Sequence, residues 1–295
     1  MASSSLFERV ALIGLGLIGS SIARVMKRDG LADEIVGCAR SEETRKKAME
    51  LGFLDRVTAE AGEAAEGADL VILCTPLGTY KVLGEAVAPH LKKGAILSDV
   101  GSVKGAVLKV LGPLVPEGVH FVPAHPVAGT EHSGPEAGFD TLFDGRWCVL
   151  TPPAGTPKEV VARVAEFWRR AGSQVEIMDA AHHDKVMAIT SHLPHLIAYT
   201  IVGTATDLEE LERTEVIKFS ASGFRDFTRI AASDPIMWRD IFLNNQEAVL
   251  EMLGRFTEDL TALQRAIRWG DSKTLEDLFT RTRAIRRRII DAKQA

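Results

Sequence analysis

Cysteine is scarce in this sequence of 295 residues, with only Cys38, Cys74 and Cys148. The three are odd in number and far apart, whereas disulfide frameworks and zinc sites need cysteines in close pairs. We therefore interpret them as small core residues of a protein in a reducing compartment. Long hydrophobic runs are also missing, because no uninterrupted apolar stretch reaches the roughly 20 residues that span a bilayer. The first residues lack the basic and apolar segments of a signal peptide, so we expect a cytoplasmic protein with no membrane partner.

The sequence also has no excess of positive charge. Its 35 lysines and arginines are outnumbered by 40 aspartates and glutamates, which gives a net charge of −5. A mildly acidic chain has no general attraction to nucleic acid, so we expect no nucleic-acid partner. Hydrophobic residues make up 46% of the chain, which is enough for a sizeable core and excludes a disordered protein.

What the sequence does contain is an alternation of short apolar runs with helical patterns over its first half. We predict strands at residues 10–13, 34–38, 70–74, 95–99, 119–123, 147–151 and 174–178. Predicted helices between them include 18–27, 42–51 and 157–171. Such alternation is typical of the α/β class, with a mostly parallel, doubly wound sheet of the Rossmann type.

The pattern changes near Asp179, after which we predict helices only. They are expected at 182–204, 207–219, 235–268 and 272–292, and Pro194 should kink the first of them. We therefore predict a dinucleotide-binding domain at 1–179 and an all-helical domain at 180–295, which would bind substrate and form a dimer.

A glycine motif follows the first predicted strand and opens a helix: Gly14-Leu15-Gly16-Leu17-Ile18-Gly19. In dinucleotide-binding folds the first glycine makes a tight turn, the second admits the pyrophosphate, and the third lets helix and strand pack closely. The helix N-terminus then presents free N–H groups to the phosphates. The strand before the motif and the helix after it are the context that the motif requires.

The end of the second predicted strand bears on the choice of cofactor. A carboxylate about 20 residues after the glycines would bind the ribose of NAD, but this chain has Ala39, Arg40 and Ser41 there. Arg40 could pair with a 2′-phosphate and Ser41 could donate a hydrogen bond, so we favour NADP. The alternative is that Arg40 is a solvated surface residue and the enzyme takes either NADP or NAD. We also assign Thr75-Pro76, which closes the strand predicted at 70–74, to the cofactor site.

Six blocks resemble the prephenate and arogenate (cyclohexadienyl) dehydrogenases, the TyrA family, and they occur in family order along nearly the whole chain. They are GLGLIGSS at 14–21, DVGSVK at 99–104, HPVAGTE at 125–131, SHLPH at 191–195, GFRDFTR at 223–229 and SDPIMWRD at 233–240. The resemblance implies an NAD(P)-dependent oxidative decarboxylation of prephenate or arogenate in tyrosine biosynthesis. Ala39 departs from the Asp of many NAD-using relatives, which puts NAD specificity in doubt.

The resemblance also implies roles for individual residues. His125 matches the catalytic histidine and, lying just after the fifth predicted strand, could accept the proton of the substrate hydroxyl. Ser102 matches a serine that could orient His125 or the nicotinamide carboxamide, or cap the helix that follows. Thr130 is a candidate substrate contact. His195 and Arg229 match residues that bind the carboxylates of the dianionic substrate, for which an arginine is well suited.

The same resemblance implies a homodimer formed through the helical half and makes tyrosine, the end product, a candidate feedback inhibitor. We expect no metal, although His182, His183, His192 and His195 lie close in sequence, because they come without an evident carboxylate ligand set and the chemistry needs no metal.

Two other functions remain open at this stage. A β-hydroxyacid dehydrogenase would use a lysine early in the helical domain, and Lys185 is available there. A non-catalytic NADP-sensing protein would have no need of a base together with two groups for a dianion.

Overall fold

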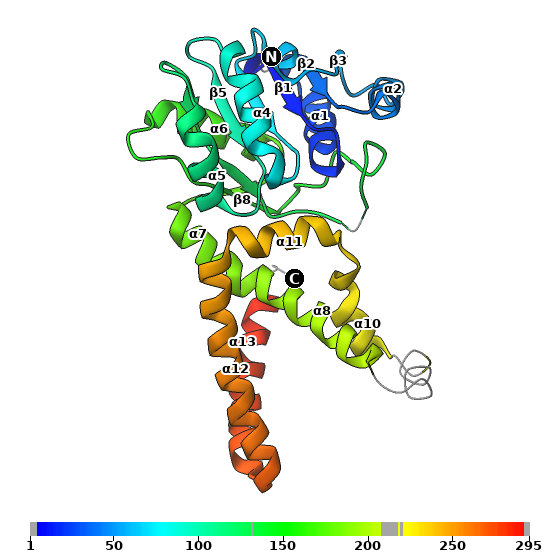
Figure 1. The fold of residues 1–295 in the computed structure, drawn as a ribbon, viewed down its shortest axis with the longest axis vertical. Helices are drawn as coiled ribbons and strands as arrows, with labels where there is room; N and C mark the ends of the chain where they lie inside the picture. Colours follow the sequence, from blue (N-terminus) through cyan, green and yellow to red (C-terminus); the bar gives the residue numbers. More distant parts are fainter. Residues whose placement is uncertain (1–4, 131, 208–217, 219–220, 292–295) are drawn as a thin grey trace. The chain divides into compact units, whose positions relative to one another are not determined.

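The computed structural model describes residues 5–130, 132–207, 218 and 221–291 (Figure 1). Within them, the larger sheet has six parallel strands in the order β3-β2-β1-β4-β5-β6. The strands are β1 (Phe7–Ile13), β2 (Ala32–Cys38), β3 (Arg56–Thr58), β4 (Leu70–Leu73), β5 (Ile96–Asp99) and β6 (His120–Phe121). This is the strand order of the Rossmann fold, so the predicted fold class is confirmed. Only the short β3 was not predicted.

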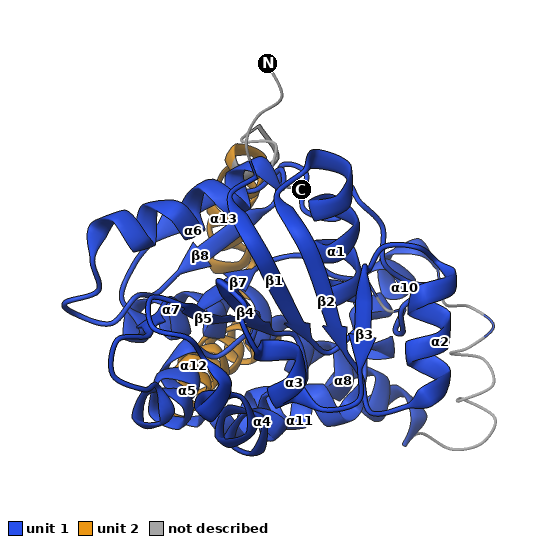
Figure 2. Cartoon of the chain, turned by 90° about the horizontal axis from the view of Figure 1, so that it is seen from above, with its two compact units in different colours: residues 1–246 blue, residues 247–295 orange. Residues whose placement is uncertain are grey.

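Strand β1 shows why the sheet is covered on both faces. Val10 and Leu12 belong to one buried apolar cluster, and Ala11 and Ile13 belong to another, as expected because successive side chains of a strand point to opposite faces. The first cluster includes residues of α1 (Leu17–Asp29) and α6 (Lys158–Arg170). The second includes residues of α3 (Ala61–Ala65), α4 (Tyr80–Val87) and α5 (Lys104–Leu111). Figure 2 shows these two helical layers on either side of the strands, and α2 (Glu42–Glu50) lies beside β3 at the edge.

Three further strands form a second sheet, which contains a residue of the predicted active site. They are β7 (Ala124–Pro126), β8 (Trp147–Leu150) and β9 (Gln174–Ile177), with β7 antiparallel to β8 and β8 parallel to β9. His125 is the middle residue of β7 and pairs with Val149. His125 does lie just after the fifth predicted strand, which is β6 in the structure, but it also belongs to a short strand that we did not predict. Prolines at 123 and 126 limit β7 to three residues, too short for the alternation that reveals a strand.

After residue 179 the described residues form helices and no strand. They are α7 (Ala180–Met187), the π-helical turn η4 (Ala188–His192), α8 (Leu193–Thr206), α10 (Ser222–Thr228), the 3₁₀ turn η5 (Arg229–Ala232), α11 (Pro235–Asn244), α12 (Gln246–Trp269) and α13 (Ser272–Asp291). The irregularity expected at Pro194 is a π turn just before it. The helix predicted at 207–219 falls almost wholly outside the described residues.

The single helix predicted at 235–268 is wrong, because α11 ends at Asn244 and α12 begins at Gln246. The backbone of Asn245 leaves the helical conformation, with φ −110° and ψ 33°. Its side chain is buried and donates from Nδ2 to the carbonyl oxygen of Asp184 at 2.9 Å. This hydrogen bond to a residue 61 positions earlier in the sequence therefore accompanies a break in a helix that the local sequence pattern predicts to be continuous.

The chain forms two compact units, Met1–Gln246 and Glu247–Ala295 (Figure 2). All the site residues predicted from the sequence lie in the first unit. The domain boundary that we predicted at 179 stays a prediction. One helical stretch, Ala180–Thr206, has the length and apolarity of a membrane span, and 28% of its most apolar window is buried within the chain.

Candidate active site

The glycine turn between β1 and α1 has the shape that a dinucleotide needs. Gly14 has φ +107°, a conformation that side chains disfavour. A Cβ on Gly19 would lie 2.1 Å from the carbonyl oxygen of Gly14, so the third glycine is required for helix and turn to pack. A Cβ on Gly16 would meet nothing within 4 Å, which leaves open space beside the N-terminus of α1. No side chain caps that N-terminus, so its first backbone N–H groups are left to bind a ligand. The turn, which includes Leu15, Leu17 and Ile18, therefore fits a pyrophosphate.

These two glycines give a matched pair of predictions. Gly16→Ala should leave the melting temperature unchanged but raise the dinucleotide Kd by about 10- to 100-fold, because a methyl group fills the open space beside the helix terminus. Gly19→Ala should cost about 1–3 kcal/mol of stability, because its Cβ overlaps the Gly14 backbone. Thermal melts and fluorescence titration with reduced dinucleotide measure both effects. Unchanged dinucleotide binding by Gly16→Ala would show that the pyrophosphate lies elsewhere.

The segment after β2 places two arginines near the predicted ribose site. Arg40 is exposed, and Arg45 of α2 donates from one guanidinium nitrogen to the carbonyl oxygens of Ala39 and Arg40, at 2.8 and 2.6 Å. Ser41 caps α2, since its hydroxyl oxygen accepts from the N–H of Thr44. Its hydroxyl proton is not used in that bond and is available to a ligand.

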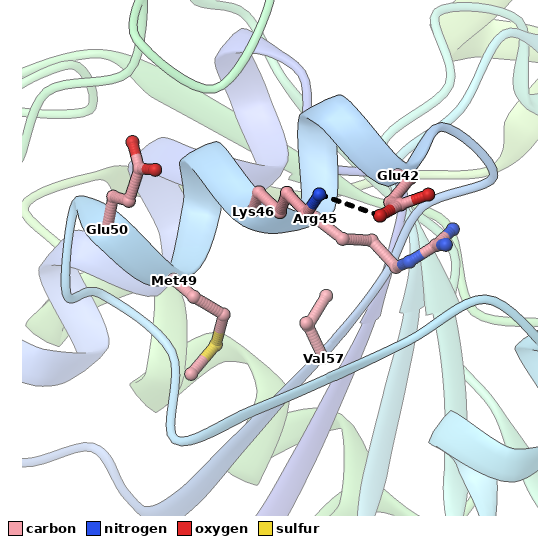
Figure 3. Close-up of a pocket in the computed structure, with 6 residues that line it drawn as sticks. All are labelled: Glu42, Arg45, Lys46, Met49, Glu50 and Val57. Atoms are coloured by element: carbon pink, nitrogen blue, oxygen red, sulfur yellow. Dashed lines mark ion pairs between the residues drawn. The ribbon is translucent and has the colours of Figure 1, made fainter.

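A surface hollow lies beside α2 (Figure 3). It is lined by Glu42, Arg45, Lys46, Met49, Glu50 and Val57. Lys46 and Glu42 form an exposed ion pair there at 2.8 Å. Arg45 lines the hollow and also bonds to Ala39 and Arg40. Arg40 and Ser41 are not among the lining residues, so we assign the hollow itself no cofactor role.

Thr75 and Pro76 lie where predicted, directly beside the glycine turn. The methyl group of Thr75 would lie 2.7 Å from a Cβ on Gly14, so the two residues are in close contact. The Thr75 hydroxyl is 2.8 Å from that of Thr79, and Pro76 leads into the short 3₁₀ helix η1 (Leu77–Thr79). The segment after β4 therefore forms one wall of the turn.

His125 lies in a buried cluster of imidazoles. Its side chain is buried, and its Nδ1 is 2.8 Å from Nε2 of His183. Burial, and then the neighbouring His183, Lys104 and His192, hold the pKa of His125 well below its usual value. The imidazole is therefore neutral at pH 7 and able to accept a proton.

A buried ion pair holds the strand that carries His125. Lys104 and Asp99 are both fully buried, and Lys104 Nζ lies 2.6 Å from Asp99 Oδ2. The same ammonium donates to the carbonyl oxygen of Ala124 at 2.6 Å, and the N–H of Ala124 donates to Asp99 Oδ1 at 3.3 Å. The pair therefore fixes the position of β7 against β5 and α5, one residue before His125.

Ser102 is half-buried in the turn between β5 and α5. It does not cap α5, as we had allowed, because the N-cap is Val103. The first N–H groups of α5 instead donate to Asp184, from Lys104 to Oδ1 and from Gly105 to Oδ2, each at 2.8 Å. The Ser102 hydroxyl is therefore not needed by the helix terminus.

Thr130 lies on an exposed loop after β7, where its hydroxyl accepts from the N–H of His132 at 3.3 Å. None of the contacts described for Thr130 joins it to the imidazole cluster. Its role as a substrate contact stays a prediction.

His195 and Arg229 lie close together, next to the same cluster. The His195 ring stacks on Trp238 with centroids 3.6 Å apart, and its Nδ1 donates to the carbonyl oxygen of Ser191 at 2.9 Å. Burial, and then the positive charge of Arg229, lower the pKa of His195. His192 lies within electrostatic reach of both His125 and His195, because a positive charge on it would disfavour protonation of either ring. His192 is itself kept neutral, since burial lowers its pKa to about 4.

Sequence reasoning missed several buried partners of these residues: Asp99, Lys104, His183, Asp184 and Asn245. His183 was noticed only as a possible metal ligand. Asp99 and Lys104 were visible at both ends of the DVGSVK block, but nothing in the sequence shows that their side chains meet. An acidic and a basic residue five positions apart around a helix start are the one local signal that could have suggested the pair.

Comparisons with known proteins give a consistent result over both halves of the chain. The family model described as the prephenate dehydrogenase nucleotide-binding domain matches residues 22–177. The model described as the prephenate dehydrogenase dimerization domain matches residues 179–281.

Individual relatives cover almost the whole chain. A cyclohexadienyl dehydrogenase of Zymomonas mobilis is 43% identical over 282 residues, which are 96% of each chain. A prephenate dehydrogenase of Bacillus subtilis is 33% identical over 92% of this chain and 72% of the relative.

Solved structures agree. Prephenate dehydrogenase from A. aeolicus, crystallised with hydroxyphenyl propionate and NAD+, superposes with a TM-score of 0.89 at 34% identity, covering 96% of this chain and 98% of that one. An arogenate dehydrogenase of Synechocystis gives 0.81 at 28% identity, with 95% and 99% covered.

Proposed function

Because the chain belongs to the prephenate dehydrogenase family, we propose that it converts prephenate, arogenate or both into 4-hydroxyphenylpyruvate or tyrosine by oxidative decarboxylation. The observation that carries this proposal is the match over 96% of both chains with a cyclohexadienyl dehydrogenase. Both substrates contain a cyclohexadienyl ring with a hydroxyl at C4 and a carboxylate at C1, so one site can serve both.

In this proposal His125 is the base. The neutral Nε2 of His125 takes the proton of the ring hydroxyl as the hydroxyl becomes a carbonyl. The glycine turn at Gly14, Gly16 and Gly19 would hold NAD(P)+, which would supply the acceptor for a hydride from the carbon that carries the hydroxyl. Loss of carbon dioxide then makes the ring aromatic. Ser102, in the turn before α5, is the candidate for a hydrogen bond to the reacting oxygen or to His125.

Arg229 and His195 bind the substrate carboxylates in this proposal. The guanidinium of Arg229 supplies positive charge to a dianion. His195 is held flat on Trp238, and its Nδ1–H is already bonded to the carbonyl oxygen of Ser191. Its Nε2 therefore donates to a substrate carboxylate only as the imidazolium, whose positive charge the carboxylate favours. Thr130 is the remaining candidate contact.

Arg229→Ala should raise the KM for the substrate by about 10- to 100-fold and change kcat little, because a charge-assisted hydrogen bond is lost equally from the ground state and the transition state. Steady-state kinetics measures both constants. Arg225→Ala, an exposed arginine one turn away on α10, is the control and should change neither. A fall in kcat at unchanged KM would contradict the binding role.

The function is tested by following the absorbance of reduced nicotinamide with prephenate or arogenate and each cofactor. We expect turnover with at least one combination and release of one carbon dioxide per reduced cofactor. No formation of reduced nicotinamide in any combination would overturn the proposal and favour a β-hydroxyacid dehydrogenase or a non-catalytic NADP-sensing protein. The structure gives the β-hydroxyacid alternative little support, since Lys185 is exposed on α7.

We propose NADP as the preferred cofactor. Arg40 and Arg45 supply positive charge at the end of β2, and Ala39 leaves no carboxylate there to repel a 2′-phosphate. The A. aeolicus relative was crystallised with NAD+, so the comparison of KM for NADP and NAD is decisive. A strong preference for NAD would refute our assignment.

We further propose that the enzyme is a cytoplasmic homodimer and that tyrosine, which keeps the ring and side-chain carboxylate of the substrate, competes for the same site. The dimerization-domain match and the exposed apolar residues Ile189, Ile201, Ile267 and Phe279 support the dimer. Light scattering that gave a stable monomer at micromolar concentration would contradict it.

A further inference from the structure

His183 is a fully buried histidine for which the reaction proposed above has no direct use. It lies on α7, and both of its ring nitrogens are occupied. Nε2 is 2.8 Å from Nδ1 of His125, and Nδ1 is 2.8 Å from Oδ1 of Asp184. The two imidazole rings meet edge to face, with centroids 5.0 Å apart. The three side chains therefore form one continuous hydrogen-bonded chain that ends at the proposed base.

Asp184 fixes the direction of these hydrogen bonds. Its two oxygens accept from the backbone N–H groups of Lys104 and Gly105, each at 2.8 Å. A backbone N–H can only donate, so these bonds hold the carboxylate in place as an acceptor. The nitrogen of His183 that faces Oδ1 must then carry its proton. A neutral His183 protonated at Nδ1 has a bare Nε2, which can only accept.

The same logic extends to His125. Its Nδ1 faces the bare Nε2 of His183 and must donate, so the proton of neutral His125 is on Nδ1. The free lone pair is then on Nε2, the nitrogen that points away from the chain. This is the tautomer that a base acting through Nε2 requires, and the opposite tautomer would have no lone pair to offer there.

We propose that Asp184 and His183 are positioning residues, which hold His125 in the Nδ1-protonated tautomer. This proposal rests on the proposed function of His125 as the base. During the reaction the proton of the substrate hydroxyl bonds to Nε2 of His125 while its bond to oxygen breaks. The resulting imidazolium donates from Nδ1 to His183, whose own N–H is held by the Asp184 carboxylate. The proton leaves to solvent afterwards, and no redox change occurs in the chain.

Other charged and titratable groups act on His125 as well. Lys104 of α5 and His192 of η4 disfavour a positive charge on it, and the sulfur of Cys148 of β8 accepts from the backbone N–H of His125. His183 also disfavours a positive charge on His125. The role proposed for the chain to Asp184 is therefore to fix the tautomer of His125 and not to raise its pKa.

The first experiment compares His183→Phe, His183→Gln and His182→Phe. His183→Phe removes the acceptor and should lower kcat by about 10- to 100-fold, less than loss of the base itself, while KM for the substrate stays within about twofold because the carboxylate-binding residues are untouched. His183→Gln keeps an acceptor oxygen and should recover part of kcat. His182 is the exposed neighbour on α7, and His182→Phe should leave both constants unchanged.

The second experiment needs neither substrate nor cofactor. The ¹⁵N NMR signals of labelled histidines distinguish a protonated nitrogen from a bare one, and His125→Asn identifies the signals of His125. In the wild-type protein we expect His125 to be protonated at Nδ1 and bare at Nε2. In His183→Phe we expect the two tautomers to be mixed.

The outcomes separate this proposal from the proposed function. A wild-type protein that is inactive with prephenate and arogenate overturns the function, whereas the NMR result still tests the tautomer. An active wild-type enzyme with full kcat in His183→Phe, or a wild-type His125 protonated at Nε2, overturns the positioning role. If His183→Phe does not fold, His183→Gln and the wild-type NMR spectrum decide.

Discussion

His125→Asn is expected to lower kcat by about 10²- to 10⁴-fold, the usual contribution of a positioned general base, and to leave the KM for the substrate nearly unchanged. Asparagine fills part of the same buried space in β7 but offers no nitrogen that can accept a proton at neutral pH. Steady-state kinetics with saturating cofactor gives both constants, and the exposed His132→Asn is the control.

The pH dependence gives a second readout of the same variant. The pKa of His125 is held well below its usual value by burial and by His183, Lys104 and His192, so the base stays unprotonated as the pH falls through 6.5. We therefore expect kcat/KM of the wild type to decline only at a lower pH, and this acid limb should be absent in His125→Asn. A larger change in KM than in kcat would instead make His125 a binding residue.

Lys104→Met should be the most destabilising of the substitutions considered. It removes one partner of a fully buried ion pair and leaves the Asp99 carboxylate with only the donors Gly101, Tyr80 and Ala124. Breaking such a pair costs about 3–5 kcal/mol, which corresponds to a fall in Tm of about 6–20 °C. Activity should fall as well, because Lys104 also holds the carbonyl of Ala124, next to His125.

The double variant Asp99→Asn with Lys104→Met is the control for this prediction. It removes both charges while retaining most of the volume, so it should recover part of the lost Tm, since an uncharged pair leaves no uncompensated charge in the core. Thermal melts of the three proteins decide. A single variant as stable as the wild type, or a double variant less stable than Lys104→Met, would show that the ion pair does not hold β7.

Local patterns were enough to predict most of the first half of the fold. The second half of β1, Val10 to Ile13, and all of β4 are continuous apolar runs. Gly14 and Gly19 specify the turn after β1, the first by its positive φ and the second by its close contact with the Gly14 backbone. Tertiary contacts decided the rest. β7 is three residues long, preceded by Pro123 and ended by Pro126, and its position depends on Asp99 and Lys104. The break at Asn245 exists because one amide reaches the backbone of Asp184.

The same distinction applies to the candidate site. His125, His195 and Arg229 could be named because they stand in recognisable blocks. His183 and Asp184 could not, because their partners lie 58 and 80 residues away in the sequence. A histidine and an aspartate near a helix start ordinarily indicate an exposed first turn, and only the packing of α7 against α5 and β7 shows that they are buried.

The π-helical turn at Ala188–His192 has a consequence for which face of the helix each histidine occupies. In a regular α-helix each residue advances about 100° around the axis, so His183 and His195, twelve residues apart, would differ by about 120°. The single extra residue that a π turn accommodates removes about 100° of that difference, which brings the two imidazoles to within about 20° of one azimuth. Deleting one residue from this turn would rotate His195 off the ring of Trp238 while leaving His183 in place. The carboxylate-binding His195 would then no longer lie on the same side of the helix as His183, which positions the proposed base.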